Sequence, residues 1–269
     1  MKLKTSLVLI TIAASLMWQA KAQIYDTNND VVQTFAGSAF TGYLDGQGQL
    51  TMFNYPQQVV SDTLSNLFVL DSGNRRIRKI SPDGTVTTFA GGGNSTAGYG
   101  TNVLLGQFSS MTIDHSNTLW ITANMTSFPD ATLVRIGSDG FVSRTNLDGV
   151  VNSVGLCADS LNRVYISDSV GNKIYRWLTN GTLEVFVGSG NSGSIDGNGV
   201  FTSFSNPTAL TCDFADNIYV FDAGSRIRRV NQNRDVVTIT GHPGNSDGQG
   251  TNASFDTVFG MAADASGNI

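Results

Sequence analysis

The sequence predicts an all-β protein built from repeats, and three observations lead to this prediction. Of the 269 residues, 30 are glycine, and 20 of the 21 acidic residues are aspartate, which leaves Glu184 as the only glutamate. Glycine and aspartate are typical turn residues. Runs of strong helix formers are missing throughout the sequence. The third observation is an aspartate motif that recurs along the chain.

One aspartate stands five residues before an apolar stretch in every repeat. The first pair is Asp62 and Leu67, and the recurring aspartates are Asp62, Asp114, Asp159, Asp213 and Asp264. Their spacings are 52, 45, 54 and 51 residues. Self-similarity at such a period is the signature of a repeat architecture.

Each period contains four predicted strands. An apolar first strand leads into the aspartate. Second strands follow at 67–70, 119–122, 164–167 and 218–221, and third strands at 77–80, 133–136, 174–177 and 227–230. Turns with Gly or Asn lead to fourth strands at 85–91, 182–188 and 236–241. Alternation of period two bounded by such turns is the hairpin signal. Four antiparallel strands repeated radially form the blades of a β-propeller, whose stacking buries both faces of each sheet.

The repeat resembles a known family. The pattern strand–Asp–x–x–Gly/Asn–x–strand–Asp, followed by GNRRIRKI at 73–80 and a DG turn, resembles the NHL repeat. The resemblance covers residues 31–269. It departs in the second repeat, where Ala123 replaces the aspartate that ends the other second strands (Asp71, Asp168 and Asp222). The resemblance implies six blades in the complete protein.

Four complete NHL-type blades and part of a fifth are expected within the sequence. Residues 33–37 copy the fourth strand at 87–91 but follow no first three strands, so we expect an orphan outer strand there. The repeat pattern breaks off at Ile269. We therefore expect a C-terminal truncation, with roughly 70–80 further residues closing the ring. An open or five-bladed ring is the alternative, at the cost of an exposed strand edge.

The first 22 residues have the features of a secretory signal peptide. Lys2 and Lys4 precede an apolar run, and AKA at 20–22 forms a cleavage site before Gln23. An uncleaved anchor is the alternative, but the run is shorter than the ~20 residues that a membrane span needs. The sequence thus predicts a secreted protein (periplasmic in a Gram-negative host) with a linker at 23–30, a propeller at 31–269 and no membrane span after cleavage.

The charge disfavours nucleic acid as a partner. The formal net charge is −5, and removal of residues 1–22 takes away three lysines and makes it −8. Nucleic-acid binding draws most of its affinity from phosphate neutralisation by basic residues. We therefore expect the arginines at 75–78 and 226–229 to lie over neighbouring strands and pair with aspartates.

The candidate binding face consists of the loops that follow the second and fourth strands, which emerge on one side of a meander. The predicted binding residues in these loops are Asp45, Asp71, Asp168, Asp196, Asp222 and Asp247, with Asn124, Phe128 and Asp130 from a longer loop in the second repeat. Loops held by a rigid scaffold often carry function, so we expect this face to bind an extracellular protein or carbohydrate.

Structural interpretations of the same aspartates stay open. Asp and Gly are what tight turns require, and Asp71, Asp168 and Asp222 are suited to capping the backbone amides of the loop that follows each of them. No cofactor is expected, although an Asp-Gly-x-Gly loop could hold calcium through carboxylate and carbonyl oxygens.

The sequence offers no convincing catalytic or metal-ligating set. His115 and His242 are the only histidines, too few for the usual three-ligand zinc site. Glu184 falls in an outer strand. We therefore expect a binding scaffold and not an enzyme. The alternative is a propeller enzyme of the lyase or gluconolactonase-like class whose metal site is completed by further blades.

Two further features concern covalent chemistry. Cys157 and Cys212 stand two residues and one residue before their repeat aspartates, on opposite faces of equivalent strands, so free thiols are favoured over a disulfide. Four asparagines in predicted loops or turns stand in glycosylation sequons. These are Asn94, Asn124, Asn180 and Asn252.

Overall fold

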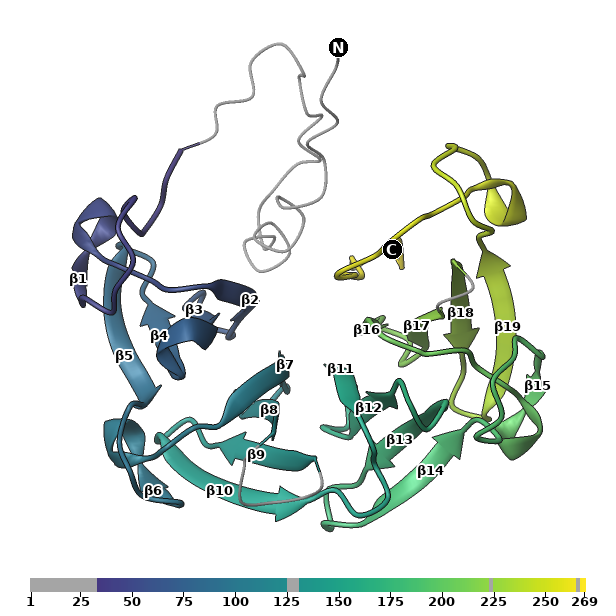
Figure 1. The fold of residues 1–269 in the computed structure, drawn as a ribbon, viewed down its shortest axis with the longest axis horizontal. Coiled ribbons are helices and arrows are strands. Elements are labelled where there is room, and N and C mark those ends of the chain that lie inside the picture. The colour runs from purple at the N-terminus through teal and green to yellow at the C-terminus, as the bar shows by residue number, and fades with distance from the viewer. Residues whose placement is uncertain (1–32, 125–130, 223–224, 265–266) are drawn as a thin grey trace. The chain divides into compact units, whose positions relative to one another are not determined.

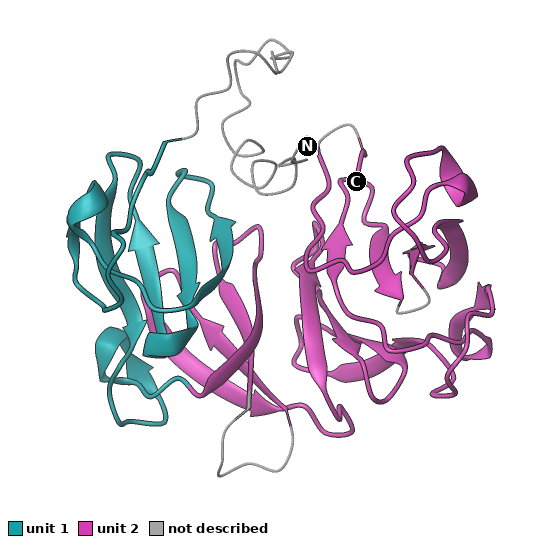
Figure 2. Cartoon of the chain, turned by 45° about the horizontal axis from the view of Figure 1, so that its top comes forward, with its two compact units in different colours: residues 1–105 teal, residues 106–269 magenta. Residues whose placement is uncertain are grey.

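The computed structural model describes residues 33–124, 131–222, 225–264 and 267–269. The signal peptide and linker predicted at 1–30 lie outside these residues and stay predictions. The chain divides into two compact units, residues 1–105 and 106–269 (Figure 2). No helix in the described ranges is long and apolar enough to span a membrane.

Unit 1 contains one antiparallel meander, which we call blade 1. Its strands are β2 (Pro56–Ser61), β3 (Leu67–Asp71), β4 (Arg76–Ile80) and β5 (Thr85–Gly91). The short strand β1 (Gly46–Gln47) pairs with β5, which gives the order β1-β5-β4-β3-β2. The other elements of this unit are β6 (Gly98–Tyr99) and the 3-10 turns η1 (Gly48–Leu50), η2 (Ser72–Asn74) and η3 (Gly100–Asn102).

Unit 2 contains three further meanders. Blade 2 consists of β7 (Gln107–Ile113), β8 (Leu119–Asn124), β9 (Thr132–Ile136) and β10 (Phe141–Asn146). Blade 3 consists of β11 (Ser153–Ala158), β12 (Val164–Asp168), β13 (Lys173–Trp177) and β14 (Leu183–Val187). Blade 4 consists of β16 (Leu210–Cys212), β17 (Ile218–Asp222), β18 (Arg226–Val230) and β19 (Asp235–Thr240), with β15 (Gly197–Asn198) on the edge of β19. The 3-10 turns are η4 (Gly199–Phe201) and η5 (Gly250–Asn252). Within this unit β11 lies between β7 and β16, so the first strands of successive blades are neighbours (Figure 1).

The second and third strands of all four blades agree with the prediction to within two residues at each end. The outer strands β1 and β15 were not predicted, because their Asp-Gly-x-Gly segments look like open loops. Gly46 and Gly197 have φ of 152° and 151°, a conformation that L side chains rarely adopt. The segments fold back along the fourth strand of their blade and cover its free edge.

Two predicted strands are not formed in the described structure. Residues 33–37 are irregular, and the Gly37 amide donates to Gly48 O and to Thr51 Oγ1. Part of a fifth blade was expected around Asp264, and residues 257–264, which lead into that aspartate, also adopt no strand. A strand is stabilised by a hydrogen-bonded neighbour, and neither segment has one among the described residues.

The recurring aspartate builds the turn between the first and second strands. Asp114 Oδ1 accepts the amides of Ser116 and Thr118, each at 2.9 Å, and Asp62 makes the same pair of bonds in blade 1. In blades 1 to 4 the residue three positions after the aspartate is left-handed, with φ between 58° and 62°. Short polar side chains tolerate this conformation, and those residues are Ser65, Asn117, Asn162 and Asp216.

The two cysteines form a disulfide between β11 and β16, with their Cα atoms 5.9 Å apart. The prediction of free thiols was therefore wrong. Cys157 lies opposite Tyr165 and Cys212 opposite Ile218, so the two cysteines do face opposite sides of their sheets. Adjacent blades, however, stack with unlike faces toward each other, and side chains on opposite faces of neighbouring blades point into the same gap.

Candidate functional site

The Asp-rich loops of blade 1 are joined by a buried arginine. Arg78, on β4, is 0% exposed and lies between Asp45 and Asp71. Its Nη2 donates to Asp45 Oδ1 at 2.7 Å, and its Nη1 donates to Asp71 Oδ2 at 3.1 Å. Asp71 also accepts the Asn54 amide at 2.7 Å. The structure thus brings Asp45 and Asp71 together, and both carboxylates are paired with the buried Arg78.

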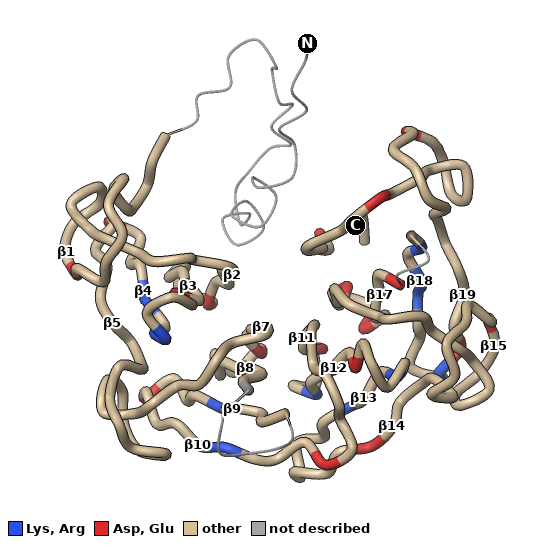
Figure 3. The backbone as a smooth tube through the Cα atoms, viewed as in Figure 1, with Lys and Arg blue, Asp and Glu red and all other residues tan. Residues whose placement is uncertain are grey.

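Blade 4 repeats the arrangement with Arg228 between Asp196 and Asp222, at 2.7 and 2.9 Å. Burial raises the pKa of Asp222, in spite of hydrogen bonds from the Ser205 amide and Arg228. Burial would also raise the pKa of Asp196, but hydrogen bonds from Thr238 and Arg228 outweigh it and lower the pKa. The predicted pairing of arginine with aspartate is confirmed for Arg78 and Arg228, and basic residues mark each third strand (Figure 3).

Asp168 of blade 3 has no arginine partner of this kind. It is buried, and its carboxylate accepts the amides of Val151, Asn152 and Gly171 at 2.9 to 3.0 Å. Only the Gly171 amide belongs to the following loop that the capping interpretation predicts. The Val151 and Asn152 amides precede the blade, so Asp168 mainly fixes the chain that enters it.

The remaining predicted residues are Asp247, Asn124, Phe128 and Asp130. Asp247 is exposed between β19 and η5. The side chain of Asn124 and all of Phe128 and Asp130 lie outside the described residues, so their binding role stays a prediction. Within the described chain no group of three His, Cys, Asp or Glu residues could hold a metal ion. The exposed sequon asparagines are Asn94, Asn180 and Asn252.

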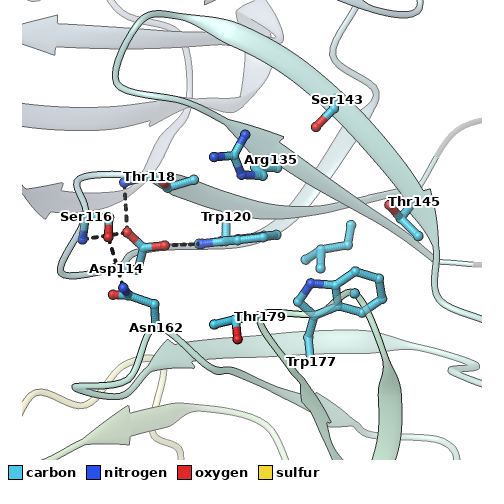
Figure 4. A pocket seen from close by; sticks show the side chains of 12 residues that line it. Asp114, Ser116, Thr118, Trp120, Arg135, Ser143, Thr145, Asn162, Trp177 and Thr179 are labelled. Carbon is cyan, nitrogen blue, oxygen red and sulfur yellow. Dashed lines mark hydrogen bonds between the residues drawn. The ribbon is translucent and has the colours of Figure 1, made fainter.

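A hollow of about 350 Å³ opens between blades 2 and 3. It lies on the side of the loops that follow the first and third strands, opposite to the face that the sequence favoured. Trp120, on β8, and Trp177, at the end of β13, line it (Figure 4). Hydroxyl and amide side chains surround the two indoles, and these are Ser116, Thr118, Ser143, Thr145, Asn162 and Thr179. A second hollow of about 550 Å³ shares Thr145, Trp177 and Gly181 with the first.

Trp120 is held in place by the aspartate of its repeat. The indole Nε1 donates to Asp114 Oδ2 at 2.8 Å (Figure 4), while Asp114 Oδ1 accepts two backbone amides. Arg135 is the cross-strand neighbour of Trp120, and its guanidinium carbon lies 6.0 Å from the centre of the ring. The hollow therefore contains an engaged carboxylate and an exposed guanidinium beside an aromatic face.

The turns of blades 2 and 3 are tied together at one end of the hollow. The His115 amide donates to Asn162 Oδ1 at 3.0 Å, and Asn162 Nδ2 donates to Ser116 Oγ at 2.9 Å. These bonds fix the spacing of the two blades there, so the hollow does not depend on an unrestrained loop.

The equivalent gap between blades 3 and 4 is filled. Arg163 Nη2 donates to Gln232 Oε1 at 2.7 Å, and Arg234 Nη2 lies 3.3 Å from Glu184 Oε2. The Arg234 guanidinium also packs 5.5 Å from the ring centre of Phe186, which is fully buried. Long side chains thus fill the gap between blades 3 and 4, whereas the equivalent space between blades 2 and 3 is open.

Tyr165 takes the position of Trp120 in this filled gap. Its hydroxyl donates to Asp159 Oδ2 at 2.9 Å and lies 3.2 Å from Gln232 Oε1. Burial raises the pKa of Tyr165 to about 12, so the hydroxyl keeps its proton at neutral pH. Tyr165 is 0% exposed, whereas Trp120 is half-buried at the rim of the hollow.

The strand register and the hydrogen bonds of the turns show which positions of the two gaps are equivalent. Four residues that fill the gap between blades 3 and 4 have small residues at the equivalent positions between blades 2 and 3. The replacements are Thr118 for Arg163, Ser143 for Glu184, Thr179 for Gln232 and Gly181 for Arg234. In addition, Phe186 sits where β14 bulges against β13, and β10 pairs with β9 without a bulge. These five differences remove volume or charge from the gap between blades 2 and 3, whereas Trp120 and Trp177 stand for the smaller Tyr165 and Val230 and add ring surface to it.

Comparison with known proteins bears on the fold. No protein-family model and no curated protein matches the sequence. A structural genomics protein of unknown function from Bacteroides thetaiotaomicron matches with a TM-score of 0.51 and 18% identity, over 86% of this chain and 70% of that one. A streptogramin B lyase matches with a TM-score of 0.54 and 17% identity, over 79% and 60%. A gluconolactonase from Xanthomonas campestris matches with a TM-score of 0.51 and 14% identity, over 68% and 61%.

The chain folds as a β-propeller. At these identities the likeness shows the fold alone, and the chain spans 60% to 70% of the length of the three structures. The narrower resemblance to the NHL repeat stays a prediction.

The two tryptophans of the hollow were not singled out from the sequence. The prediction followed loop length and aspartate content, which are properties of one repeat at a time. The available signal lay in comparing equivalent positions between repeats, where Thr179 and Gly181 stand for Gln232 and Arg234.

Proposed function

We propose that this chain is an exported carbohydrate-binding propeller whose ligand occupies the hollow between blades 2 and 3. The observation that carries the proposal is the replacement of Arg163, Glu184, Gln232 and Arg234 by small residues at this one gap. In a repeat protein, a gap emptied at several positions and lined by two indoles is suited to a ligand.

The lining favours a sugar over an apolar ligand. The C–H face of a pyranose packs on an indole, as on other flat apolar surfaces, and its hydroxyls need donors and acceptors around the rim. Trp120 and Trp177 offer the faces, while hydroxyl and amide side chains offer the polar partners. The adjoining hollow beyond Trp177 gives room for a second sugar unit.

Export is supported by two features. The first 22 residues have the pattern of a signal peptide, and Cys157 and Cys212 form a disulfide, which is typical of oxidising compartments. An extracellular or periplasmic protein meets polysaccharides directly.

Binding is a better account of the site than turnover, although two of the similar structures are a lyase and a gluconolactonase. A carboxylate that acts as a general base must be free to take a proton. Asp114, the one acidic residue that lines the first hollow, is occupied by three donors. The adjoining hollow is lined by Glu184, which is paired with Arg176 and Arg234, and by the exposed Asp148 at its edge.

The test is to fill the hollow with the residues of the closed gap. The triple variant T118R/S143E/T179Q rebuilds much of the network of blades 3 and 4, while Gly181, at φ 82°, is left unchanged. We expect the wild-type chain to bind oligosaccharides on a glycan array, and the filled variant to lose at least about tenfold in affinity with no loss of thermal stability.

The matched control is T87E, which places glutamate at the position of blade 1 that corresponds to Ser143. This variant should bind as wild type does. An array without any binder, or a filled variant that binds normally, would refute the proposal.

A further inference from the structure

We infer that the saccharide recognised in the hollow carries a carboxylate, as a uronic acid does, and that Arg135 binds it. This inference rests on the proposed carbohydrate function and specifies the class of sugar. It starts from Arg135, the one basic residue that lines the first hollow, which forms no ion pair within the described residues.

Arg135 is placed at the centre of the site. It lies on β9 with Trp120 opposite on one side and Ser143 opposite on the other. Its side chain is exposed, and its guanidinium lies over the Trp120 ring. Stacking on an aromatic ring leaves the in-plane N–H groups of a guanidinium available. Within the described part of the chain, Arg135 forms no ion pair.

Blade 3 shows one partner that a guanidinium can take at this position. Arg176 corresponds to Arg135, and its Nε donates to Glu184 Oε1 at 2.8 Å. Glu184 is the direct cross-strand neighbour of Arg176, as Ser143 is of Arg135. At the hollow none of the described residues supplies this carboxylate, and the space beside Ser143 is open. A ligand carboxylate would take the place that Glu184 takes in blade 3.

The first hollow is suited to one anionic sugar unit, whereas the adjoining hollow is lined by the carboxylates of Asp148 and Glu184 and is suited to a neutral one. The one acidic lining residue of the first hollow, Asp114, has its carboxylate engaged by two amides and the Trp120 indole. Arginine binds a carboxylate in a planar, two-bond geometry that is stronger than a neutral hydrogen bond. A sugar that packs on tryptophan and presents a carboxylate at its rim would meet both features together.

The experiment compares each acid with its own neutral ester. Trimers of galacturonate, glucuronate and mannuronate, and the methyl ester of each, are titrated into the full chain by isothermal calorimetry. We expect at least one acid to bind about tenfold or more tightly than its ester. In R135Q this preference should fall to near unity, while the weaker ester affinity is kept.

R229Q provides the matched control, because Arg229 occupies the same strand position in blade 4. It should leave the preference for the acid intact. R135K should keep part of the preference, because it retains the charge without the planar fork.

The outcomes separate this inference from the proposed function. Equal binding of acid and ester, with both lost in T118R/S143E/T179Q, would overturn the carboxylate and leave carbohydrate binding standing. A preference for the acid that survives in R135Q would also overturn the inference. Binding of no trimer and of no other glycan on the array would overturn both.

Discussion

Asp213 shows how one residue of the repeat acts on the backbone. Its carboxylate accepts the amides of Ala215 and Asn217, the Asn217 side chain at 2.9 Å and the Tyr219 hydroxyl at 3.1 Å. Burial would raise the pKa of Asp213, but these hydrogen bonds outweigh it and lower the pKa below its ordinary value. The charged form is therefore the one that stabilises the turn.

The first prediction at this scale concerns D213N. A lowered pKa in the folded state means that the stabilisation is present above the unfolded value of 3.8 and is lost as the pH falls through the folded pKa. At neutral pH we expect D213N to reduce the free energy of unfolding by about 1–3 kcal/mol. The difference from wild type should shrink steadily between about pH 5 and about pH 2. Urea denaturation across this range measures it, and a difference that does not change with pH would contradict the role given to the charge.

At the scale of strands and loops, blade 2 offers a natural comparison with blade 1. The arginine position of the third strand is Val134 in blade 2, where blade 1 has Arg78. The aspartate that ends the second strand is Ala123. Both blade 2 residues are buried. Replacing the buried arginine and the aspartate that ends the second strand is thus compatible with a formed blade, as expected when apolar residues replace a buried ion pair.

Blade 1 should tolerate apolar residues at these positions, but only when the arginine and both aspartates are replaced together. R78V alone leaves Asp71 buried without its arginine, and we expect it to lower the free energy of unfolding by about 3–5 kcal/mol. The triple variant D45A/D71A/R78V also removes the two carboxylates that R78V leaves unpaired. It should recover at least half of the unfolding free energy that R78V loses. Chemical denaturation of both variants decides this. An R78V protein as stable as wild type would show that the ion pairs contribute little.

The same comparison explains how far the sequence could predict this molecule. Strand positions follow from alternation and turn residues, because side chains in a strand change face at every residue. The disulfide of Cys157 and Cys212 and the hollow around Trp120 depend on which faces meet across a gap. That relation is absent from the pattern of a single repeat, and it becomes readable only when positions such as Thr179 and Gln232 are compared between repeats.

At the scale of the whole molecule, the two gaps of unit 2 are secured differently. The gap between blades 3 and 4 has a disulfide between β11 and β16, a buried cluster that includes Phe204 and Val220, and the polar network around Gln232. The gap between blades 2 and 3 has a buried cluster with Leu133 and Leu156 and the turn bonds of Asn162, and it leaves room for a ligand. The contacts in the gap between blades 3 and 4 thus stabilise blade 3, which also forms one wall of the hollow between blades 2 and 3.

The last prediction tests that division through the disulfide. The bridge joins residues 55 positions apart in the sequence, and closing a loop of this length in the unfolded chain contributes about 4 kcal/mol in the chain-entropy description. We expect C157S/C212S to lose most of this amount in urea denaturation, and a reducing agent to lower the wild type to the same midpoint. Binding of a ligand in the hollow should persist under conditions where the variant is folded, because neither cysteine lines it. Equal midpoints for wild type and variant would show that the bridge is not a structural support. A folded variant that no longer binds would show that the open gap depends on the closed one for its shape.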